Sequence, residues 1–241
     1  MPADIQFFIA QQATLDNWPA PNTWLGEDEI ARYVAMGSEA RRTEFLRGHW
    51  LIRLAVGYLT GRAPVSFEIR QPEKSPPIFA DVPGLITSLS HCKGWLALLV
   101  LQNEHTPTLK VGIDIETERD RPNLARLAEH SFGADWLNRH QDQLQPAFFE
   151  RWTQCEAVVK ASHLPLGTKL LRQQRFAATS ECNEGLWLYH TRLQEQPPLH
   201  LSLATPYPVK PEGFQWVGHK FSAIGPTLAA TRAPIGTHAP A

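Results

Sequence analysis

The chain has 241 residues, 43% of them hydrophobic, enough to bury a core in one large domain or two small ones. Its formal net charge of −1 gives no basic surface for phosphate backbones, so we do not expect a nucleic-acid-binding protein. The three cysteines show no metal-binding or disulfide spacing, and neither a basic leader nor a run of about 18 apolar residues occurs, so we expect a soluble cytoplasmic protein without a membrane span.

The first half of the sequence predicts a strand, a long helix and an antiparallel pair of strands. The predicted elements are a strand at 5–10, a loop at 14–26, a helix from Ser38 to Thr60 that ends at Gly61, a strand at 65–69, a proline-rich loop at 71–84, strands at 85–90 and 95–101 joined by a turn at 91–94, and a linker at 102–109.

The second half repeats this plan, which favours an α+β fold. Its predicted elements are a strand at 110–116, a helical region at 122–163 interrupted near Gly133, and strands at 174–179, 186–191, 199–204 and 214–219. The segment 225–241 is rich in Pro, Ala, Gly and Thr and poor in charge, so we expect it to be disordered.

Two carboxylates stand out in the strand at 110–116. Val111, Ile113 and Ile115 alternate with other residues, which is the period of a half-buried strand. Asp114 and Glu116 then lie together on the opposite face, with α-carbons roughly 6.6 Å apart.

A third carboxylate and a lysine follow on the predicted helix. Trp152, Glu156 and Lys160 recur every four residues and therefore lie along one side of it. Oxygen ligands suit Mg²⁺, which takes only one or two carboxylates from most proteins and leaves room for water and phosphate. The two elements together predict a site for a hard divalent cation and a phosphate group.

These motifs resemble the signature of the 4′-phosphopantetheinyl transferases, in the larger single-chain group that activates carrier proteins of fatty-acid, polyketide or nonribosomal peptide synthesis. The matching blocks, in chain order, are Arg42-Thr43-Glu44-Phe45-Leu46-Arg47-Gly48-His49, Leu89-Ser90-His91-Cys92, Gly112-x-Asp114-x-Glu116 and Trp152-Thr153-x-Cys155-Glu156-Ala157-x-x-Lys160.

The resemblance implies an architecture as well. It predicts two similar α+β subdomains, a pseudo-dimer within one monomeric chain, with the active site between them. We expect an N-terminal subdomain at 1–107, a C-terminal subdomain with the metal site at 108–224, and a tail at 225–241.

The resemblance also implies roles for individual residues. Asp114, Glu116 and Glu156 would bind Mg²⁺, and Glu156 could instead be the general base. The catalytic residues would be Asp114, Glu156 and Lys160. The expected contacts to coenzyme A are Arg47, Arg53, Lys74, Ser90, His91 and Lys160.

The implied reaction transfers the 4′-phosphopantetheine arm of coenzyme A to a serine of an apo acyl or peptidyl carrier protein and releases adenosine 3′,5′-bisphosphate, as a holo-[acyl-carrier-protein] synthase does. Three positions depart from the family pattern, at Cys155, at His49 and at 162–165 after Lys160. Two alternatives therefore remain open: a binding module for coenzyme A or a carrier protein with lost or weak turnover, and another metal-dependent enzyme that acts on a nucleotide or diphosphate. Because Cys155 only borders the apolar stripe of its helix, we expect a lysine to be tolerated there.

Overall fold

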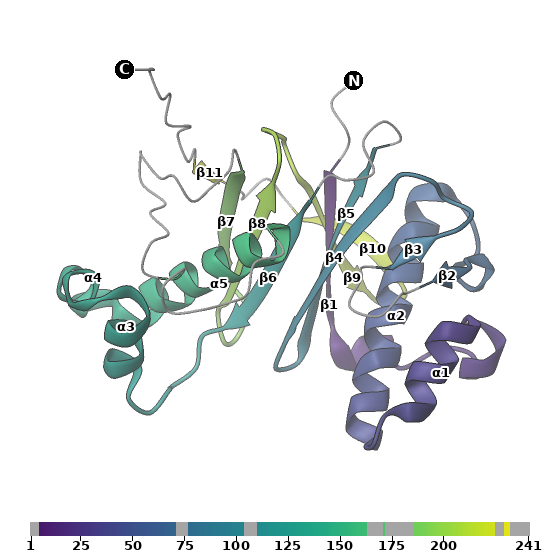
Figure 1. Ribbon diagram of the computed structural model, residues 1–241, viewed down its shortest axis with the longest axis horizontal. Coiled ribbons are helices and arrows are strands. Elements are labelled where there is room, and N and C mark those ends of the chain that lie inside the picture. The colour runs from purple at the N-terminus through teal and green to yellow at the C-terminus, as the bar shows by residue number, and fades with distance from the viewer. Residues whose placement is uncertain are drawn as a thin grey trace. The chain divides into compact units, whose positions relative to one another are not determined.

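The computed structural model describes residues 5–70, 77–103, 110–162, 171, 186–224 and 229–231 (Figure 1). The chain divides into two units, one made of 1–109 and 210–226, the other of 110–209 and 227–241. Both combine helices with a mostly antiparallel sheet, which confirms the α+β class. No helix in the described part of the chain is long and apolar enough to span a membrane.

The first unit is built on a five-stranded sheet. Its elements are β1 (Ile5–Gln11), α1 (Glu27–Ala35), α2 (Glu39–Thr60), β2 (Ile69–Arg70), β3 (Ile78–Phe79), β4 (Leu85–Cys92), β5 (Trp95–Gln102), β9 (Glu212–Val217) and β10 (Lys220–Ile224), with short 3₁₀ turns at Gln12–Leu15, Pro21–Thr23 and Pro64–Ser66. The strand order is β10-β9-β1-β5-β4, and β2 and β3 pair separately. Only β9 and β1 run parallel to each other.

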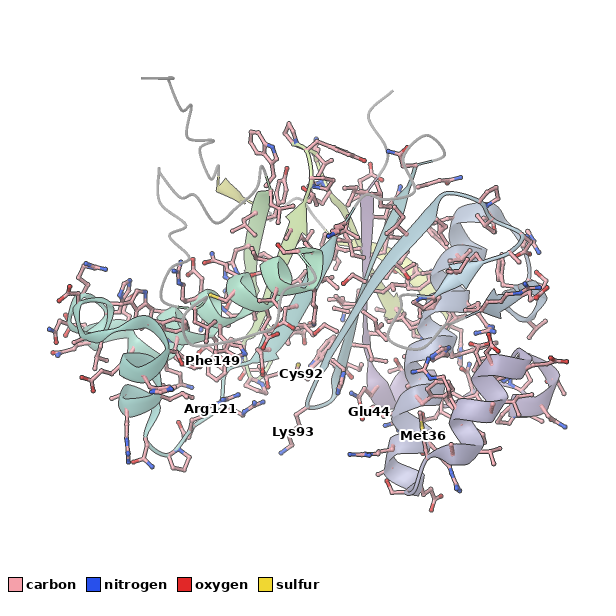
Figure 2. All side chains as sticks on the ribbon, in the orientation of Figure 1. Met36, Glu44, Cys92, Lys93, Arg121 and Phe149 are labelled. Atoms are coloured by element: carbon pink, nitrogen blue, oxygen red, sulfur yellow. The ribbon has the colours of Figure 1, made fainter. Side chains whose placement is uncertain are left out.

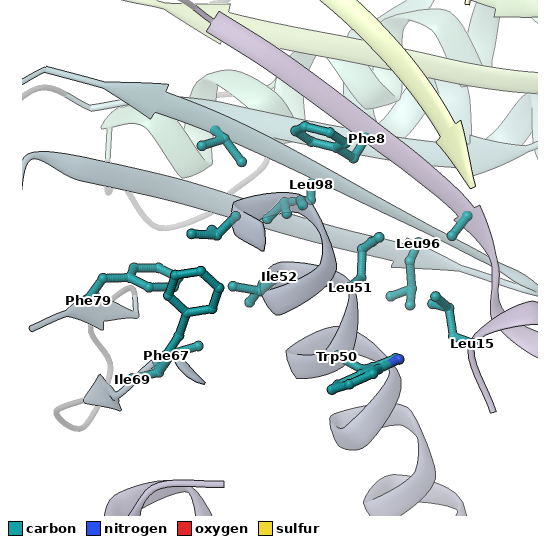
Figure 3. Packing of buried hydrophobic residues seen from close by; sticks show 14 of the residues in the cluster. Phe8, Leu15, Trp50, Leu51, Ile52, Phe67, Ile69, Phe79, Leu96 and Leu98 are labelled. Atoms are coloured by element: carbon teal, nitrogen blue, oxygen red, sulfur yellow. The ribbon is translucent and has the colours of Figure 1, made fainter. Parts of the chain in front are cut away.

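Helix α2 has the limits that its sequence predicts. The Ser38 side chain accepts a hydrogen bond from the backbone N–H of Arg41 at 3.3 Å, and Gly61 ends the helix in the left-handed region with φ 72°. Leu51 and Ile52 are 0% and 1% exposed and belong to the core shared with the sheet (Figure 3). Burying such side chains stabilises the unit by about 1.5–3 kcal/mol each.

The second unit carries the strand and helix with the motif residues. Its elements are β6 (Gly112–Thr117), α3 (Leu124–Phe132), α4 (Ala134–Arg139), α5 (Leu144–Ser162), β7 (Trp187–Leu193), β8 (Leu199–Thr205) and β11 (Ala229–Thr231), with a 3₁₀ turn at Gln141–Gln143. The sheet order is β11-β7-β8-β6, and α5 packs on β6, β8 and β7. As predicted, the helical region breaks at Gly133.

Several predicted elements need correction. Helix α1 was not predicted, and 65–69 forms a 3₁₀ turn followed by the two-residue β2 rather than one strand. The predicted turn at 91–94 is shorter, since β4 continues to Cys92 and pairs with Trp95. Part of the expected disordered tail forms β11, which pairs with β7. The strand predicted at 174–179 lies outside the described residues.

The predicted boundary of the second subdomain is also wrong in one respect. Strands β9 and β10, within the expected 108–224 segment, belong to the sheet of the first unit, because β9 pairs with β1. Sequence alternation shows that a strand exists but does not show its partner. The similarity of the two units as a pseudo-dimer stays a prediction.

The glycine of the Gly-x-Asp-x-Glu motif is required by packing. A Cβ on Gly112 would lie 1.9 Å from the carbonyl oxygen of Ala157 in α5. We therefore expect Gly112→Ala to lower the free energy of unfolding by about 1–3 kcal/mol, because rigid backbone would have to move. Urea unfolding measures this. Gly37→Ala is the control, since its Cβ would meet nothing within 4 Å; equal losses in both variants would contradict the packing argument.

Candidate active site

Strand β6 places its two faces as the sequence predicts. Ile113 and Ile115 are 0% and 1% exposed on one face. Gly112, Asp114 and Glu116 share the other face, against which α5 packs. Asp114 is itself 6% exposed, so this face is buried too and its carboxylates are held out of bulk solvent.

Helix α5 brings Lys160 to Asp114. The Lys160 Nζ donates to Asp114 Oδ1 at 2.8 Å and to the carbonyl oxygen of Ile113 at 3.0 Å. Sequence spacing had predicted that Lys160 lies one turn after Glu156 on one side of the helix, and the structure adds that this side faces Asp114. The ammonium group is thereby fixed beside the carboxylates of β6.

The other two predicted metal ligands, Glu116 and Glu156, interact electrostatically with Asp114. Burial raises the pKa of Glu116, and Asp114 raises it further against the opposing effect of Arg119. Burial also raises the pKa of Glu156, and both Asp114 and Glu116 add to that increase while Lys160 opposes it. Asp114 therefore disfavours the charged forms of Glu116 and Glu156, and Glu116 disfavours that of Glu156, in a partly desolvated place.

Glu116 has further positively charged neighbours in the segment after β6. Arg119 Nη1 lies 3.2 Å from Glu116 Oε2, and Arg121 Nη2 lies 3.7 Å from Glu116 Oε1. Oε2 is nevertheless buried without a hydrogen bond. Arg121 also lies over the Phe149 ring, 5.5 Å from its centroid, and both side chains are labelled in Figure 2. The aromatic contact keeps this guanidinium near the start of α5.

These residues fit a hard divalent cation in donor type and charge. Asp114, Glu116 and Glu156 supply oxygen donors, and a cation would offset the charge repulsion that raises the pKa of Glu116 and of Glu156. The buried Oε2 of Glu116 has no hydrogen bond to a described residue, only the ion pair with Arg119, so it could turn to a cation. In their present conformations, the His, Cys, Asp and Glu side chains of the described ranges include no group of three that could hold a metal ion.

The first unit holds the other predicted phosphate contacts. Ser90 is 5% exposed within β4. The His91 side chain is 55% exposed and its Nε2 lies 3.3 Å from Glu44 Oε1 of α2. Figure 2 labels Glu44 on that helix. His91 is therefore reachable by a ligand and has an acidic neighbour.

Arg47 of α2 is partly exposed and is paired with an aspartate. Arg47 makes a two-pronged contact with Asp16, from Nε to Oδ1 at 2.7 Å and from Nη2 to Oδ2 at 2.6 Å, and its side chain is 22% exposed. The contact with Asp16 raises the pKa of Arg47. Lys74, a further predicted contact, lies outside the described residues.

Arg53 is a correction. Its side chain is 0% exposed, and its guanidinium donates to Glu29 Oε1 and Oε2 at 2.9 and 2.5 Å and to the carbonyl oxygen of Trp24 at 3.0 Å. We therefore assign Arg53 to the core rather than to coenzyme A. No local pattern indicates this pairing, because the partner Glu29 lies on α1, which was not predicted.

Cys155 lies inside the core. It is 0% exposed, and burial raises the pKa of its thiol to about 12. The expectation that lysine is tolerated there is wrong for this structure. We now expect Cys155→Lys to lower the free energy of unfolding by at least about 2 kcal/mol, because an ammonium group would be buried without a partner.

Thermal melting tests the Cys155→Lys prediction. Gln143→Lys adds the same charge at an exposed position near the start of α5 and is the control, with an expected change within about 0.5 kcal/mol. Melting of Cys155→Lys at the wild-type temperature would show that a lysine can leave the core there.

Sequence reasoning missed a group of buried polar side chains on the same face as Asp114 and Glu116. Thr153 Oγ1 and Ser202 Oγ lie 2.8 Å apart, and His190 Nδ1 lies 3.0 Å from Ser202 Oγ. His200 Nε2 lies 2.8 Å from Glu118 Oε1. The one available signal was alternation in β8, where His200 and Ser202 stand between buried leucines.

Comparison with known proteins agrees with the motifs. Residues 110–209 match the family model of the 4′-phosphopantetheinyl transferase superfamily. The chain is 31% identical over 145 residues to the 4′-phosphopantetheinyl transferase HetI of Nostoc sp., covering 57% of this chain and 59% of HetI. It is 32% identical over 172 residues to the 4′-phosphopantetheinyl transferase AcpT of Escherichia coli O157:H7, covering 66% of this chain and 81% of AcpT. The AcpT of Escherichia coli K12 matches to the same extent. The chain thus spans less than two thirds of HetI but most of AcpT, and it belongs to the 4′-phosphopantetheinyl transferase superfamily.

Proposed function

We propose that this protein transfers the 4′-phosphopantetheine arm of coenzyme A to a serine of an apo acyl or peptidyl carrier protein. The observation that carries the proposal is the buried face of β6 and α5, where Asp114, Glu116 and Glu156 interact and Lys160 bonds to Asp114. The four residues belong to the motifs that resemble the family signature, and they lie within the residues 110–209 that the family model matches. The names of the relatives support the same activity.

The reaction exchanges one phosphorus–oxygen bond for another. The carrier serine oxygen forms a bond to the phosphorus that bears the pantetheine arm, and the bond from that phosphorus to adenosine 3′,5′-bisphosphate breaks. The serine proton passes to a base, and the electron pair of the broken bond leaves with the bisphosphate. Little covalent chemistry falls to the protein, so positioning and charge stabilisation dominate.

Each site residue has a role in this scheme. Asp114, Glu116 and Glu156 would hold Mg²⁺, which when bound stabilises the negative charge of the diphosphate oxygens. Lys160, fixed by Asp114 and the carbonyl of Ile113, presents its ammonium group to the same charge. Glu156 is also a candidate base, because a carboxylate can accept the serine proton directly or through a water molecule.

The finer properties of the enzyme are part of the proposal. We infer membership of the larger single-chain group, the holo-[acyl-carrier-protein] synthase activity, a Mg²⁺ requirement, a monomeric state and a cytoplasmic location. Arg47, Ser90, His91 and Lys74 remain predicted contacts for the phosphates of coenzyme A. The position of the active site between the two subdomains stays a prediction.

Intact-mass spectrometry of an apo carrier protein tests the proposal. After incubation with coenzyme A, Mg²⁺ and this protein, the carrier should gain one phosphopantetheine mass. A carrier with its acceptor serine replaced by alanine is the control and should gain nothing. Saturable binding of coenzyme A with no mass gain on the apo carrier would instead identify a binding module without turnover, the alternative left open by the departures from the family pattern at Cys155, His49 and 162–165.

His91 gives a prediction about recognition rather than chemistry. A 3′-phosphate contact lies away from the reacting phosphorus, so its loss removes binding that is equal in ground and transition states. We therefore expect His91→Ala to raise KM for coenzyme A by about 10-fold and to leave kcat nearly unchanged. A 10-fold change corresponds to the free energy of about one hydrogen bond to a charged group. The same variant should discriminate less between coenzyme A and its 3′-dephospho analogue. Undiminished discrimination would place the 3′-phosphate elsewhere.

A further inference from the structure

A row of polar residues crosses the second sheet beside the proposed cation site. Glu116 of β6 pairs in register with His200 of β8, and His200 pairs with Arg192 of β7. Residues paired in this way lie on one face with Cβ atoms about 4.5–5.5 Å apart. Helix α5 packs on this face, and the Phe149 ring centroid lies 6.2 Å from that of His200. Polar residues under a helix are costly unless they are bonded, so the row calls for an explanation.

The His200 ring is held at one edge. Its Nε2 lies 2.8 Å from Glu118 Oε1, and the same oxygen accepts from Arg192 Nε at 2.5 Å. A guanidinium can only donate, so Glu118 Oε1 acts as an acceptor. His200 Nε2 therefore carries the proton of this bond, and in the neutral ring Nδ1 keeps its lone pair.

The other edge of the ring, at Nδ1, has no hydrogen-bond partner among the described residues. His200 is 1% exposed, and within the described part of the chain its Nδ1 is buried without a hydrogen bond. Glu116 Oε2, from the residue paired with His200, is likewise buried without a hydrogen bond to any described residue, although Arg119 Nη1 lies 3.2 Å from it in an ion pair. A buried acceptor nitrogen such as Nδ1 is costly to the fold when it is left without a donor. Both atoms are acceptors, so they cannot satisfy each other.

A hydrated divalent cation bound by Glu116 would give both atoms a partner. A carboxylate oxygen binds such a cation directly, and Mg²⁺ keeps several of its waters when it is bound to protein. Those waters are donors that a neighbouring imidazole nitrogen can accept. Groups that orient the ligands and waters of a metal in this way commonly change its affinity by 10–100-fold.

We propose that His200, oriented by Glu118 and Arg192, is a positioning residue of the cation site and that its Nδ1 accepts a hydrogen bond from the water shell of the cation held by Asp114, Glu116 and Glu156. The proposal rests on the proposed function, because it takes those carboxylates as the ligands. It assigns to His200 a role that the family motifs do not contain.

Two substitutions separate this role from a structural one. His200→Asn keeps a polar group near the place of Nδ1 but cannot reach Glu118. His200→Gln keeps a polar group near the place of Nε2, where it can bond Glu118, but leaves nothing at Nδ1. A purely structural histidine would be replaced better by Gln, whereas a partner of the cation would be replaced better by Asn.

The test measures binding of Mn²⁺ to the free protein by electron paramagnetic resonance. We expect the Mn²⁺ Kd to rise at least about 10-fold in His200→Gln and clearly less in His200→Asn. The control is His49→Gln, which alters a buried histidine with a carboxylate partner in the first unit and should leave the Kd unchanged. Melting curves confirm that each variant is folded.

The outcomes are distinct for the two proposals. If the wild-type protein binds Mn²⁺ and His200→Gln binds it equally well, the role of His200 is overturned while the cation site stands. If Asn and Gln weaken binding equally, His200 only supports the fold and the proposal is again overturned. If the wild-type protein binds no Mn²⁺ while still modifying a carrier, the carboxylates are not cation ligands. The role proposed for His200 is then overturned as well.

Discussion

Replacement of Asp114 by Asn should reduce phosphopantetheine transfer by about 100–1000-fold, the range typical for loss of one group that stabilises charge in a transition state. Asn keeps the shape of the side chain and an acceptor for Lys160, but it removes the negative charge. The cation would lose one of few carboxylate ligands, and Lys160 would lose its counter-charge. The initial rate of carrier modification at saturating coenzyme A measures the effect.

Two controls make the Asp114 result specific. Far-ultraviolet circular dichroism and melting should show a folded protein, because Asn is nearly isosteric with Asp. Asp142→Asn removes an exposed carboxylate from the same unit and should keep near-normal activity. A folded Asp114→Asn enzyme with wild-type turnover at limiting Mg²⁺ would refute the assignment of Asp114 to the cation.

Replacement of Glu29 by Ala should lower the free energy of unfolding of the first unit by about 3–5 kcal/mol. Glu29 is 0% exposed, accepts from His49 Nδ1 at 2.5 Å, and bonds Arg53 through both carboxylate oxygens. Its loss leaves the guanidinium of Arg53 buried without a counter-charge. Asp81→Ala is the matched control, since it breaks the ion pair of Arg62 with Asp81 on the surface and should cost at most about 1 kcal/mol.

The same cluster gives a direction for acid sensitivity. Burial alone would raise the pKa of Glu29, but hydrogen bonds from His49 and Arg53 outweigh it and lower the pKa from 4.5 to about 2. The stabilisation by the Glu29 carboxylate is therefore complete above about pH 4.5 and is lost as the pH falls towards 2. Urea unfolding across this range should show a steeper loss in the wild type than in Glu29→Ala. Parallel curves would contradict the assignment.

Local patterns sufficed for the parts of the site that lie within one element. The alternation of β6 placed Asp114 and Glu116 on one face, and the four-residue spacing of α5 placed Glu156 and Lys160 on one side. The contact of Lys160 with Asp114 follows once the two elements pack. The cap at Ser38 and the stop at Gly61 likewise depend on neighbours in sequence, and α2 has those limits.

Features that depend on distant partners could not be predicted. Arg53 was expected to contact coenzyme A, but it is paired with Glu29 of α1, a residue 24 positions earlier in the chain. Cys155 borders the apolar stripe of α5 in sequence, and only tertiary packing decides that it is buried. The pairing of β9 with β1 joins segments about 200 residues apart, and no local pattern specifies such a partner. The role of His200 depends in the same way on its cross-strand neighbour.

The most direct test of the account is the release of adenosine 3′,5′-bisphosphate from coenzyme A, measured by chromatography over a series of apo carrier concentrations. A phosphopantetheinyl transferase must release one bisphosphate for each carrier molecule modified. We predict that release in the presence of Mg²⁺ rises in proportion to the apo carrier supplied and stops when the carrier is fully modified. Equal release of bisphosphate without any carrier would contradict the account and identify a hydrolase acting on the diphosphate.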